Sequence, residues 1–215
     1  MEILRFKNVS YRANDTMLLN NLNLSINEGD FISISGPSGS GKSTFFKLTN
    51  HLISPVSGEI IYRNKNIMEY DPVHLRKKIC LCSQMPYLFG DRVLDNLIFP
   101  FSQRKLTINM DLINNYLSLL NLDESFLHKH PKNLSGGEKQ RIAIIRSVAI
   151  KPDILLLDEV TSALDEANTS AVEELIKKLN SNGVTILWIT HDSSQYQRLG
   201  NRRINIETGN LREVE

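Results

Sequence analysis

One stretch of nine residues restricts the fold of this chain more than any other. It follows the apolar run Phe31–Ser35 and precedes an apolar segment with helical spacing. Its members, in order, are Gly36, Pro37, Ser38, Gly39, Ser40, Gly41, Lys42, Ser43 and Thr44. They match the pattern G-x-x-x-x-G-K-[ST] between a predicted strand and a predicted helix. The stretch therefore predicts a phosphate-binding loop in an α/β fold, with a Gly/Ser-rich turn and an incidental lysine as the alternative.

The residue types in this loop explain the predicted chemistry. Glycines let the backbone turn tightly, so that successive N–H groups converge on phosphate oxygens at a helix N-terminus. Lys42 adds a full positive charge toward the β- and γ-phosphates, and Ser43 supplies a hydroxyl for Mg²⁺. These features predict nucleotide binding, but the loop alone does not name the kind of nucleotide hydrolase.

A pair of carboxylates follows a second apolar strand pattern. The run Ile154–Asp158 ends in Asp158, and Glu159 comes next. Strand C-termini are where open α/β sheets place their ligands. Asp158 is suited to hold Mg²⁺, and Glu159 to polarise a water for attack on the γ-phosphate. The alternative is a pair of solvated acids at a strand end, which the phosphate-loop pattern makes the weaker interpretation.

Length, charge and cysteine content exclude several classes of protein. The chain has 215 residues, which favours one domain, and 25 basic against 24 acidic residues give a net charge of +1. Without a basic stripe, we expect no nucleic-acid partner. No apolar run approaches a membrane span, and the charged N-terminus does not resemble a signal peptide. Cys80 and Cys82 are interpreted as reduced core residues rather than half of a metal site.

Short β-branched runs alternate with helical patterns, which predicts an α/β fold. The predicted strands are Leu4–Val9, Leu22–Ile26, Phe31–Ser35, Gly58–Tyr62, Ile79–Ser83, Ile154–Asp158, Thr185–Thr190 and Arg203–Ile206. The predicted helices are Lys42–His51, Val93–Phe99, Asp111–Leu122, Gly136–Ile150 and Ala167–Ser181. Between Gln84 and Leu134 the pattern becomes mostly helical, which predicts an inserted helical region.

The segment that separates the possible classes is LSGGEKQR, residues 134–141, at the start of a predicted helix. Ser135 and Glu138 have the spacing of a capping box. A capping box does not explain Gly136 and Gly137, because each glycine weakens the first turn by about 1 kcal/mol. Bare backbone N–H groups that a phosphate can approach closely do explain them.

With this segment the sequence resembles the ABC ATPase family over nearly its whole length, because LSGGEKQR matches the family's signature motif. Tyr11 is similar to the aromatic residue that stacks on adenine, and Gln84 to the Q-loop glutamine that senses Mg²⁺ and the attacking water. The segment 162–165, ending in Asp165, matches the D-loop. His191 alone after a strand would be unremarkable, but here it matches the switch histidine that contacts the γ-phosphate.

The resemblance implies a P-loop NTPase core of ABC type, with an N-terminal antiparallel β subdomain and an inserted helical subdomain. It implies that residues 1–84 and 151–215 form the core and β subdomain, and that about 85–150 form the helical subdomain. ATP and Mg²⁺ are the implied cofactors. The implied state is a head-to-tail homodimer that closes on two ATP molecules, with Ser135 and Gly137 acting on the partner's nucleotide. An integral membrane permease subunit is the implied partner, which would place the chain in the cytoplasm, peripheral on the inner face of the cell membrane.

Finer similarity points in more than one direction. The stretch from Gln84 to Leu97 is similar to exporters, whereas residues 130–133 are similar to the stand-alone subunits typical of importers. Val160 stands where most members have proline, and with Leu88–Asp91 this is similar to the Fet-type ATPases of an iron exporter. The direction of transport stays open. A non-transport ABC ATPase, such as an iron–sulfur assembly subunit, is the alternative. A DNA-repair or translation ABC protein is disfavoured because no second ATPase domain, coiled-coil insertion or basic linker is visible.

Overall fold

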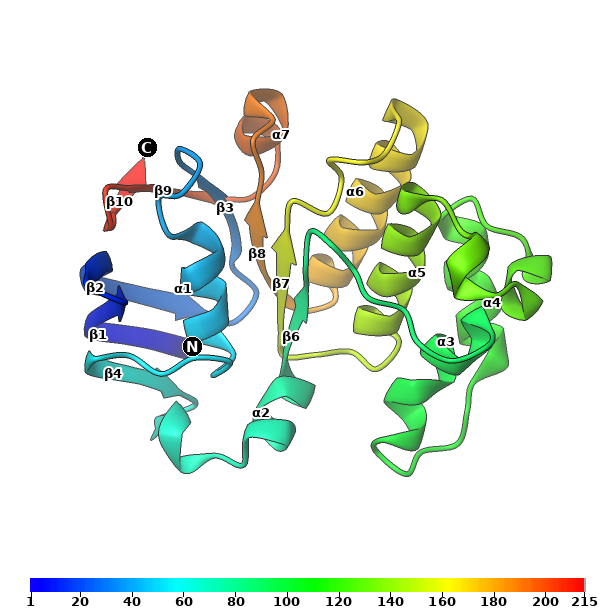
Figure 1. Ribbon diagram of the computed structural model, residues 1–215, viewed down its shortest axis with the longest axis horizontal. Helices are drawn as coiled ribbons and strands as arrows, with labels where there is room; N and C mark the ends of the chain where they lie inside the picture. Colours follow the sequence, from blue (N-terminus) through cyan, green and yellow to red (C-terminus); the bar gives the residue numbers. More distant parts are fainter. Residues whose placement is uncertain (215) are drawn as a thin grey trace. The chain divides into compact units, whose positions relative to one another are not determined.

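The computed structural model describes residues 1–214, which form two compact units. The first unit contains residues Met1–Leu81, Asp153–Asp158 and the chain from Gly183 onward. The second contains Cys82–Pro152 and Glu159–Asn182. Each unit is described by itself below, and Figure 1 labels their helices and strands.

The first unit begins with an antiparallel sheet of four strands in the order β2-β1-β4-β5. Its strands are β1 (Glu2–Ala13), β2 (Thr16–Asn27), β4 (Ser57–Tyr62) and β5 (Lys65–Asn66). Buried and exposed residues roughly alternate along β2, as expected for strands with one face on the core. This sheet confirms the predicted N-terminal antiparallel β region.

A second, six-stranded sheet has the order β10-β9-β3-β8-β7-β6. Its strands are β3 (Phe31–Ser35), β6 (Ile79–Cys82), β7 (Ile154–Asp158), β8 (Thr185–Ile189), β9 (Arg202–Glu207) and β10 (Asn210–Val214). The pairs β3–β8, β7–β8 and β3–β9 are parallel. Every residue of β7 and β8 is buried, which explains their nearly continuous apolar sequences.

Three helices belong to the first unit: α1 (Lys42–Thr49), α2 (Pro72–Lys78) and α7 (Ser193–Arg198). Phe45 and Phe46 of α1 are fully buried in a core cluster that draws apolar residues from both sheets. The ring of Phe45 lies 4.8 Å from that of Phe6 on β1. Helix α1 is therefore fixed by the same core that holds the two sheets.

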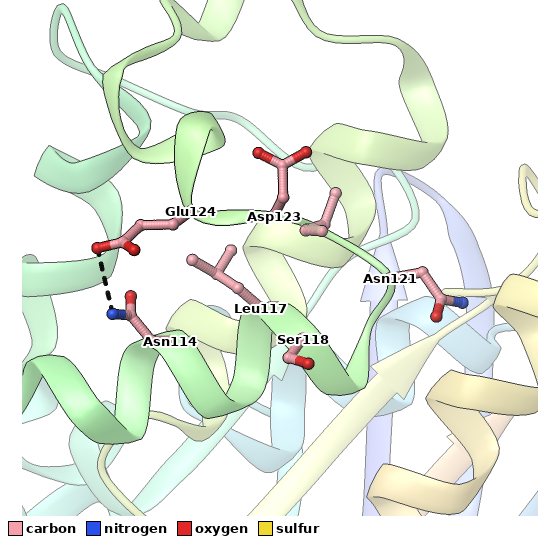
Figure 2. A pocket seen from close by; sticks show the side chains of 7 residues that line it. Asn114, Leu117, Ser118, Asn121, Asp123 and Glu124 are labelled. Atoms are coloured by element: carbon pink, nitrogen blue, oxygen red, sulfur yellow. Dashed lines mark hydrogen bonds between the residues drawn. The ribbon is translucent and has the colours of Figure 1, made fainter.

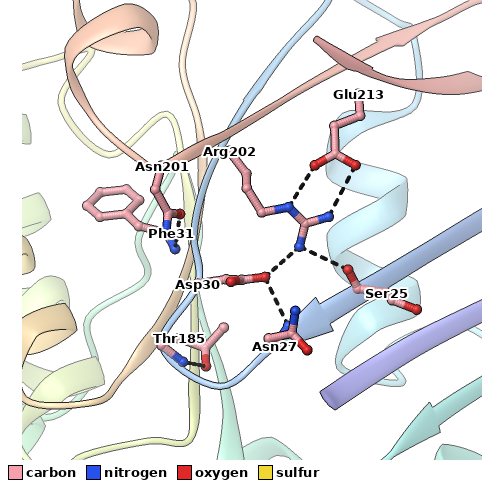
Figure 3. Close-up of polar contacts among 9 residues, drawn as sticks. Ser25, Asn27, Asp30, Phe31, Thr185, Asn201, Arg202 and Glu213 are labelled. Atoms are coloured by element: carbon pink, nitrogen blue, oxygen red, sulfur yellow. Dashed lines mark hydrogen bonds and ion pairs between the residues drawn. The ribbon is translucent and has the colours of Figure 1, made fainter. Parts of the chain in front are cut away.

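Arg202 ties the C-terminal hairpin to the turn before β3 (Figure 3). Its guanidinium pairs with Asp30 and forms a two-pronged contact with Glu213 of β10, at 2.7 and 3.2 Å. The same group donates a hydrogen bond to the carbonyl of Ser25 at 3.0 Å. This network holds the edge strand β10, which the sequence did not reveal, against the rest of the first unit.

The second unit is helical. Its helices are α3 (Val93–Ser102), α4 (Met110–Leu119), α5 (Gly136–Val148) and α6 (Glu166–Ser181), with short 3₁₀ turns at Glu124–His128 and Pro131–Asn133. A further 3₁₀ turn, Ile67–Glu69, lies in the first unit. No helix among residues 1–214 is long and apolar enough to cross a membrane.

Most predicted elements are present, and their ends differ by a few residues. The strands Phe31–Ser35 and Ile154–Asp158 have the predicted bounds. Helix α1 ends at Thr49 rather than His51, and α5 ends at Val148 rather than Ile150. The elements β5, α2 and α7 were not predicted because each is too short to show a period, and β10 was not predicted because its sequence, NLREV, contains no apolar run. Helix α6 groups with the other helices in the second unit. The predicted helical subdomain at about residues 85–150 stays a prediction.

Neither Cys80 nor Cys82 is part of a disulfide. Cys82 is buried, as predicted for a core residue, whereas Cys80 is only partly buried. The Sγ atom of Cys80 lies 3.5 Å from the carbonyl of Arg76. No group of three or more metal-ligand side chains exists within the described 214 residues.

Asp153 joins the start of β7 to the antiparallel sheet. Its carboxylate accepts hydrogen bonds from the hydroxyl of Tyr62 at 2.6 Å and from Nε of Arg63 at 3.0 Å. Burial raises the pKa of Asp153, but the two hydrogen bonds and the positive charges of Lys78 and Arg63 together leave the pKa below its ordinary value. The charged carboxylate therefore stabilises the folded state.

Asp153→Asn should reduce the free energy of unfolding at neutral pH by about 1–3 kcal/mol, because the buried hydroxyl of Tyr62 and the partly exposed guanidinium of Arg63 lose a charged acceptor. Since the folded pKa is lowered, this stabilisation is present above the ordinary carboxyl value of 3.8 and disappears as pH falls through the folded pKa. Urea unfolding from pH 7 down to pH 3 measures both effects. The wild type should lose its advantage over the variant at the acid end; a constant difference across this range would contradict the assignment.

Candidate functional site

The predicted phosphate loop leaves β3 and enters α1 within the first unit. The N-cap of α1 is Gly41, with φ +103°, and it makes no side-chain cap hydrogen bond. Most helices satisfy their first N–H groups with a Ser, Thr, Asp or Asn side chain. Here no side chain takes that place, so the N-terminus of α1 presents backbone donors and the positive end of the helix dipole to an anion.

Lys42 lies buried beside this loop, with 6% of its surface exposed. Its Nζ donates hydrogen bonds to the carbonyls of Gly36 at 2.9 Å and Pro37 at 2.8 Å. The hydroxyl of Ser40 is buried without a hydrogen-bond partner among the described residues. A buried ammonium and an unsatisfied hydroxyl in one loop fit an anionic ligand, because a phosphate oxygen would supply the missing acceptor.

Asp158 ends β7, and His191 follows the end of β8, in strands next to this loop. Asp158 of β7 is in register with Ile189 of β8, and Ile189 is in register with Ile34 of β3. The N–H of Thr190, just before His191, donates to the carbonyl of Ile34 at 3.1 Å. All three strands are parallel, so their C-terminal ends share one edge of the sheet. The first unit thus brings together the loop, a buried carboxylate and an exposed histidine.

Glu159 and Gln84 lie together in the second unit. Nε2 of Gln84 donates a hydrogen bond to a carboxylate oxygen of Glu159 at 2.7 Å. Glu159 has φ +50°, a left-handed conformation that non-glycine residues adopt rarely. The N–H and hydroxyl of Ser162 both donate to the carbonyl of Glu159, at 3.2 and 2.9 Å. Strained backbone held by neighbouring groups is common at active sites, so this carboxylate is a candidate base.

The segment LSGGEKQR opens α5 as predicted. The hydroxyl of Ser135 accepts from the N–H of Glu138 at 3.2 Å, and the N–H of Ser135 donates to the Glu138 carboxylate at 2.7 Å. The backbone donor of Ser135 holds the pKa of Glu138 below its ordinary value. The predicted capping box is therefore present. It gives hydrogen-bond partners to the N–H groups of Ser135 and Glu138.

The two glycines of this segment have different surroundings. A Cβ on Gly136 would meet nothing within 4 Å. A Cβ on Gly137 would lie 3.1 Å from Leu164 and 3.2 Å from the carbonyl of Ala163. Gly136 thus leaves the exposed helix start open to an approaching group. At Gly137 the absence of a side chain also allows close packing against the segment 162–165.

The remaining predicted site residues occupy defined places. Asp165 is the N-cap of α6, and its carboxylate accepts from the N–H of Asn168 at 2.8 Å. Tyr11 of β1 is partly buried and packs against the core of the first unit. Ser43 is exposed, and Thr44 is partly exposed, in the first turn of α1. The predicted site residues are thus divided between the two units.

The second unit also contains hollows that the predicted residues do not explain. A groove of about 530 Å³ follows the end of α4 and contains the hydrogen bond from Asn114 to Glu124 (Figure 2). It is lined by Asn114, Leu117, Ser118, Asn121, Leu122, Asp123 and Glu124. None of these residues was singled out from the sequence, because they lie in a helix end and loop without a recognisable pattern.

Comparison with known proteins decides the family. The pattern that defines the family described as ABC transporter matches residues 19–162 of this chain. The chain belongs to the ABC transporter family. It is 43% identical to the probable iron export ATP-binding protein FetA of Escherichia coli K12, over 90% of this chain and 86% of that protein. It is 35% identical to the choline transport ATP-binding protein OpuBA of Bacillus subtilis, of which it spans 52%.

Solved structures agree with this assignment. The fold is similar to that of the ATP-binding cassette MJ0796 in a dimeric post-hydrolysis state bound to ADP and Pi, with a TM-score of 0.87 and 35% identity. The match covers 99% of this chain and 98% of the cassette. The predicted fold class, a P-loop NTPase core of ABC type, is therefore confirmed, and the chain is an ATP-binding ATPase of that family.

Proposed function

We propose that this chain is the motor subunit of a transporter that drives the export of a metal, iron, through a separate membrane permease. It works as a head-to-tail homodimer in which the signature segment of each copy completes the nucleotide site of the other. The proposed dimer is supported by the geometry at the N-terminus of α5. This helix start is capped by Ser135, yet Gly136 leaves it exposed and open. A helix N-terminus built in this way suits the γ-phosphate of an ATP bound to another copy.

Each step of ATP binding and hydrolysis is assigned to a residue described in the candidate site. Lys42 and the N–H groups at the start of α1 bind the phosphates of the substrate ATP. Glu159 accepts a proton from the attacking water, and Gln84 orients the Glu159 carboxylate through their 2.7 Å hydrogen bond. His191, just beyond the end of β8, contacts the γ-phosphate. Tyr11 stacks on the adenine.

A magnesium ion fits the oxygen donors that these segments supply. Ser43 offers an exposed hydroxyl at the start of α1, and Asp158 offers a carboxylate at the C-terminal end of β7. Mg²⁺ prefers oxygen ligands of this kind and keeps several waters. With Gln84 these residues would hold the ion, which neutralises charge on the phosphate oxygens when bound.

The permease contact is assigned to a groove in the second unit. The groove has a volume of about 280 Å³ and is lined by Pro86, Tyr87, Leu88, Phe89, Gly90, His130, Pro131, Lys132 and Lys139. Tyr87 is 78% exposed, while Phe89 packs edge-on against Phe99. The carbonyl of Tyr87 accepts a hydrogen bond from Arg146 at 3.0 Å. An ordered apolar floor with basic side chains around it suits a short acidic segment of the permease.

Iron export rests on the similarity to FetA and on Val160, which is fully buried where most family members have proline. Because the permease contacts the transported substrate, this chain would bind only MgATP, at the inner face of the cell membrane. The alternative is a non-transport ABC ATPase such as an iron–sulfur assembly subunit. Co-purification of the tagged chain from detergent extracts separates the two: a polytopic membrane protein supports the transporter, and soluble scaffold proteins alone would overturn it.

Ser135→Arg should abolish the ATP-dependent dimer without weakening ATP binding to the monomer. The long cation would occupy the helix start that the partner's γ-phosphate must reach, and the lost cap costs only about 1 kcal/mol. Size-exclusion chromatography with ATP, in a Glu159→Gln background, measures the dimer, and a fluorescent ATP analogue measures monomer affinity. Ser170→Arg, at an exposed position of α6, is the matched control. If monomer affinity collapsed along with the dimer, Ser135 would not act on the second copy.

A further inference from the structure

Asn168, in the first turn of α6, connects three segments of the second unit. Its Oδ1 accepts hydrogen bonds from Arg141 at 2.8 Å and from the amide of Asn121 at 3.2 Å. Its Nδ2 donates to the carboxylate of Asp165 at 3.0 Å, and its backbone N–H donates to the same carboxylate at 2.8 Å. The oxygen faces donors and the nitrogen faces a carboxylate, so the partners fix the orientation of this amide.

Arg141 connects Asn168 to the signature segment, residues 134–141. It lies on α5 within LSGGEKQR and is buried, with 8% of its surface exposed. The same guanidinium nitrogen that contacts Asn168 also donates to the carbonyls of Leu120, at 2.7 Å, and Asn121, at 3.1 Å. Arg141 therefore caps the end of α4 while it holds Asn168. Figure 2 shows Asn121 at one end of the α4 groove, away from the Asn114–Glu124 hydrogen bond.

The signature helix and the segment 162–165 meet at a second point. As described above, Gly137 packs against Ala163 and Leu164 so closely that an added Cβ would lie 3.1 Å from the Leu164 side chain. One end of the D-loop thus contacts the first turn of α5, and the other end, Asp165, is tied through Asn168 to Arg141. Two contacts at separate points prevent one segment from shifting without the other.

We propose that Asn168 is a positioning residue that locks the D-loop to the signature helix, so that both face a second copy as one rigid surface. The inference rests on the proposed head-to-tail dimer. Asn168 touches no nucleotide in this scheme and acts through Asp165 and Arg141. If Asn168 served only to support the start of α6, its loss would change stability slightly and leave dimer formation unaffected.

Asn168→Asp tests the link with little change of shape. The aspartate keeps an oxygen for Arg141 but replaces the donor facing Asp165 with a second carboxylate, which repels it. Asn168→Ala removes both contacts, while Arg141 still has the two backbone carbonyls to bind. Asn115→Ala, at an exposed position of α4, is the control.

The readouts are the ATP concentration for half-maximal dimer formation in the Glu159→Gln background, the monomer's affinity for a fluorescent ATP analogue, and the melting temperature. We expect both Asn168 variants to need about ten-fold more ATP to dimerise, with monomer affinity unchanged. Combining Asn168→Ala with Arg141→Lys should be clearly less than additive, since both break the same link.

Three results would overturn the inference: dimer formation unchanged in both Asn168 variants, monomer affinity reduced in parallel with dimer formation, or full additivity with Arg141→Lys. Melting temperatures within a few degrees of the control keep these comparisons valid for Asn168→Asp even if Asn168→Ala folds poorly. Failure of the proposed dimer is a separate result, because the Glu159→Gln parent would then form no ATP-dependent dimer at all.

Discussion

Glu159→Gln is expected to reduce ATP hydrolysis by about 10²- to 10⁴-fold, the usual contribution of a general base. Glutamine has the same shape as glutamate and can still accept the hydrogen bond from Gln84, but it cannot take a proton from water. ATP binding should persist, because Lys42 and the start of α1 are unchanged. With hydrolysis blocked, the closed dimer should accumulate in the presence of ATP, since ATP binding favours that state and nothing removes the nucleotide.

Phosphate release measures the loss of hydrolysis, and size-exclusion chromatography measures the trapped dimer. Glu174→Gln is the matched control, because Glu174 is an exposed glutamate of α6 that takes part in no proposed step. Near-normal turnover in the Glu159 variant would show that another group serves as base. A loss of ATP binding would show instead that the left-handed turn at Glu159 tolerates no change.

The sequence predicted the elements whose pattern is long or chemically distinctive. The strand–loop–helix around Lys42 and the buried strand ending at Asp158 were found with nearly correct ends, because their apolar runs and glycine positions are local signals. The capping box at Ser135 was also predicted, since its two partners are three residues apart. Signals of this kind can be recognised in a single sequence.

Contacts between distant residues could not be predicted in this way. Arg202 meets Glu213 when β10 pairs with β9, and it meets Asp30 when β9 pairs with β3. Arg141 meets Asn168 only when α5 and α6 pack together. Nothing in the local sequence around Asn168 marks it as more than a residue in a first helical turn. The hydrogen bond from Gln84 to Glu159 spans 75 positions, so the family resemblance suggested both residues but not their contact.

The left-handed turn at Glu159 shows the same limit in the backbone. Glutamate has no intrinsic preference for φ +50°, and the residue types around it do not predict that conformation. It is imposed by the hydrogen bonds from Ser162 and by the burial of Val160. Strain that the surrounding fold imposes is therefore visible only in the structure, although it falls on a residue that the sequence had already singled out.

Gly36→Ala should unfold or severely destabilise the chain, whereas Gly29→Ala should be tolerated. Both glycines have positive φ, +145° and +80°, so alanine at either position strains the backbone, by about 1 kcal/mol or more. At Gly36 the new Cβ would also lie 2.0 Å from the carbonyl oxygen of Ile206. That oxygen belongs to β9, which pairs with β3 immediately before the loop, so it cannot move away without breaking the parallel ladder. At Gly29 a Cβ meets nothing within 4 Å.

Thermal unfolding without ATP measures the stability of the fold, and the rise in melting temperature with ATP measures nucleotide binding by the loop. Gly29→Ala should lower the melting temperature by about 2–4 °C and keep the rise that ATP produces. Gly36→Ala should lower it by about 10 °C or more, and the ATP-dependent rise should disappear because the loop can no longer surround the phosphates. Equal losses in the two variants would mean that backbone strain alone matters. A Gly36 variant that retained the ATP response would show that the loop does not depend on its close approach to β9, and the phosphate site would then have to be built differently.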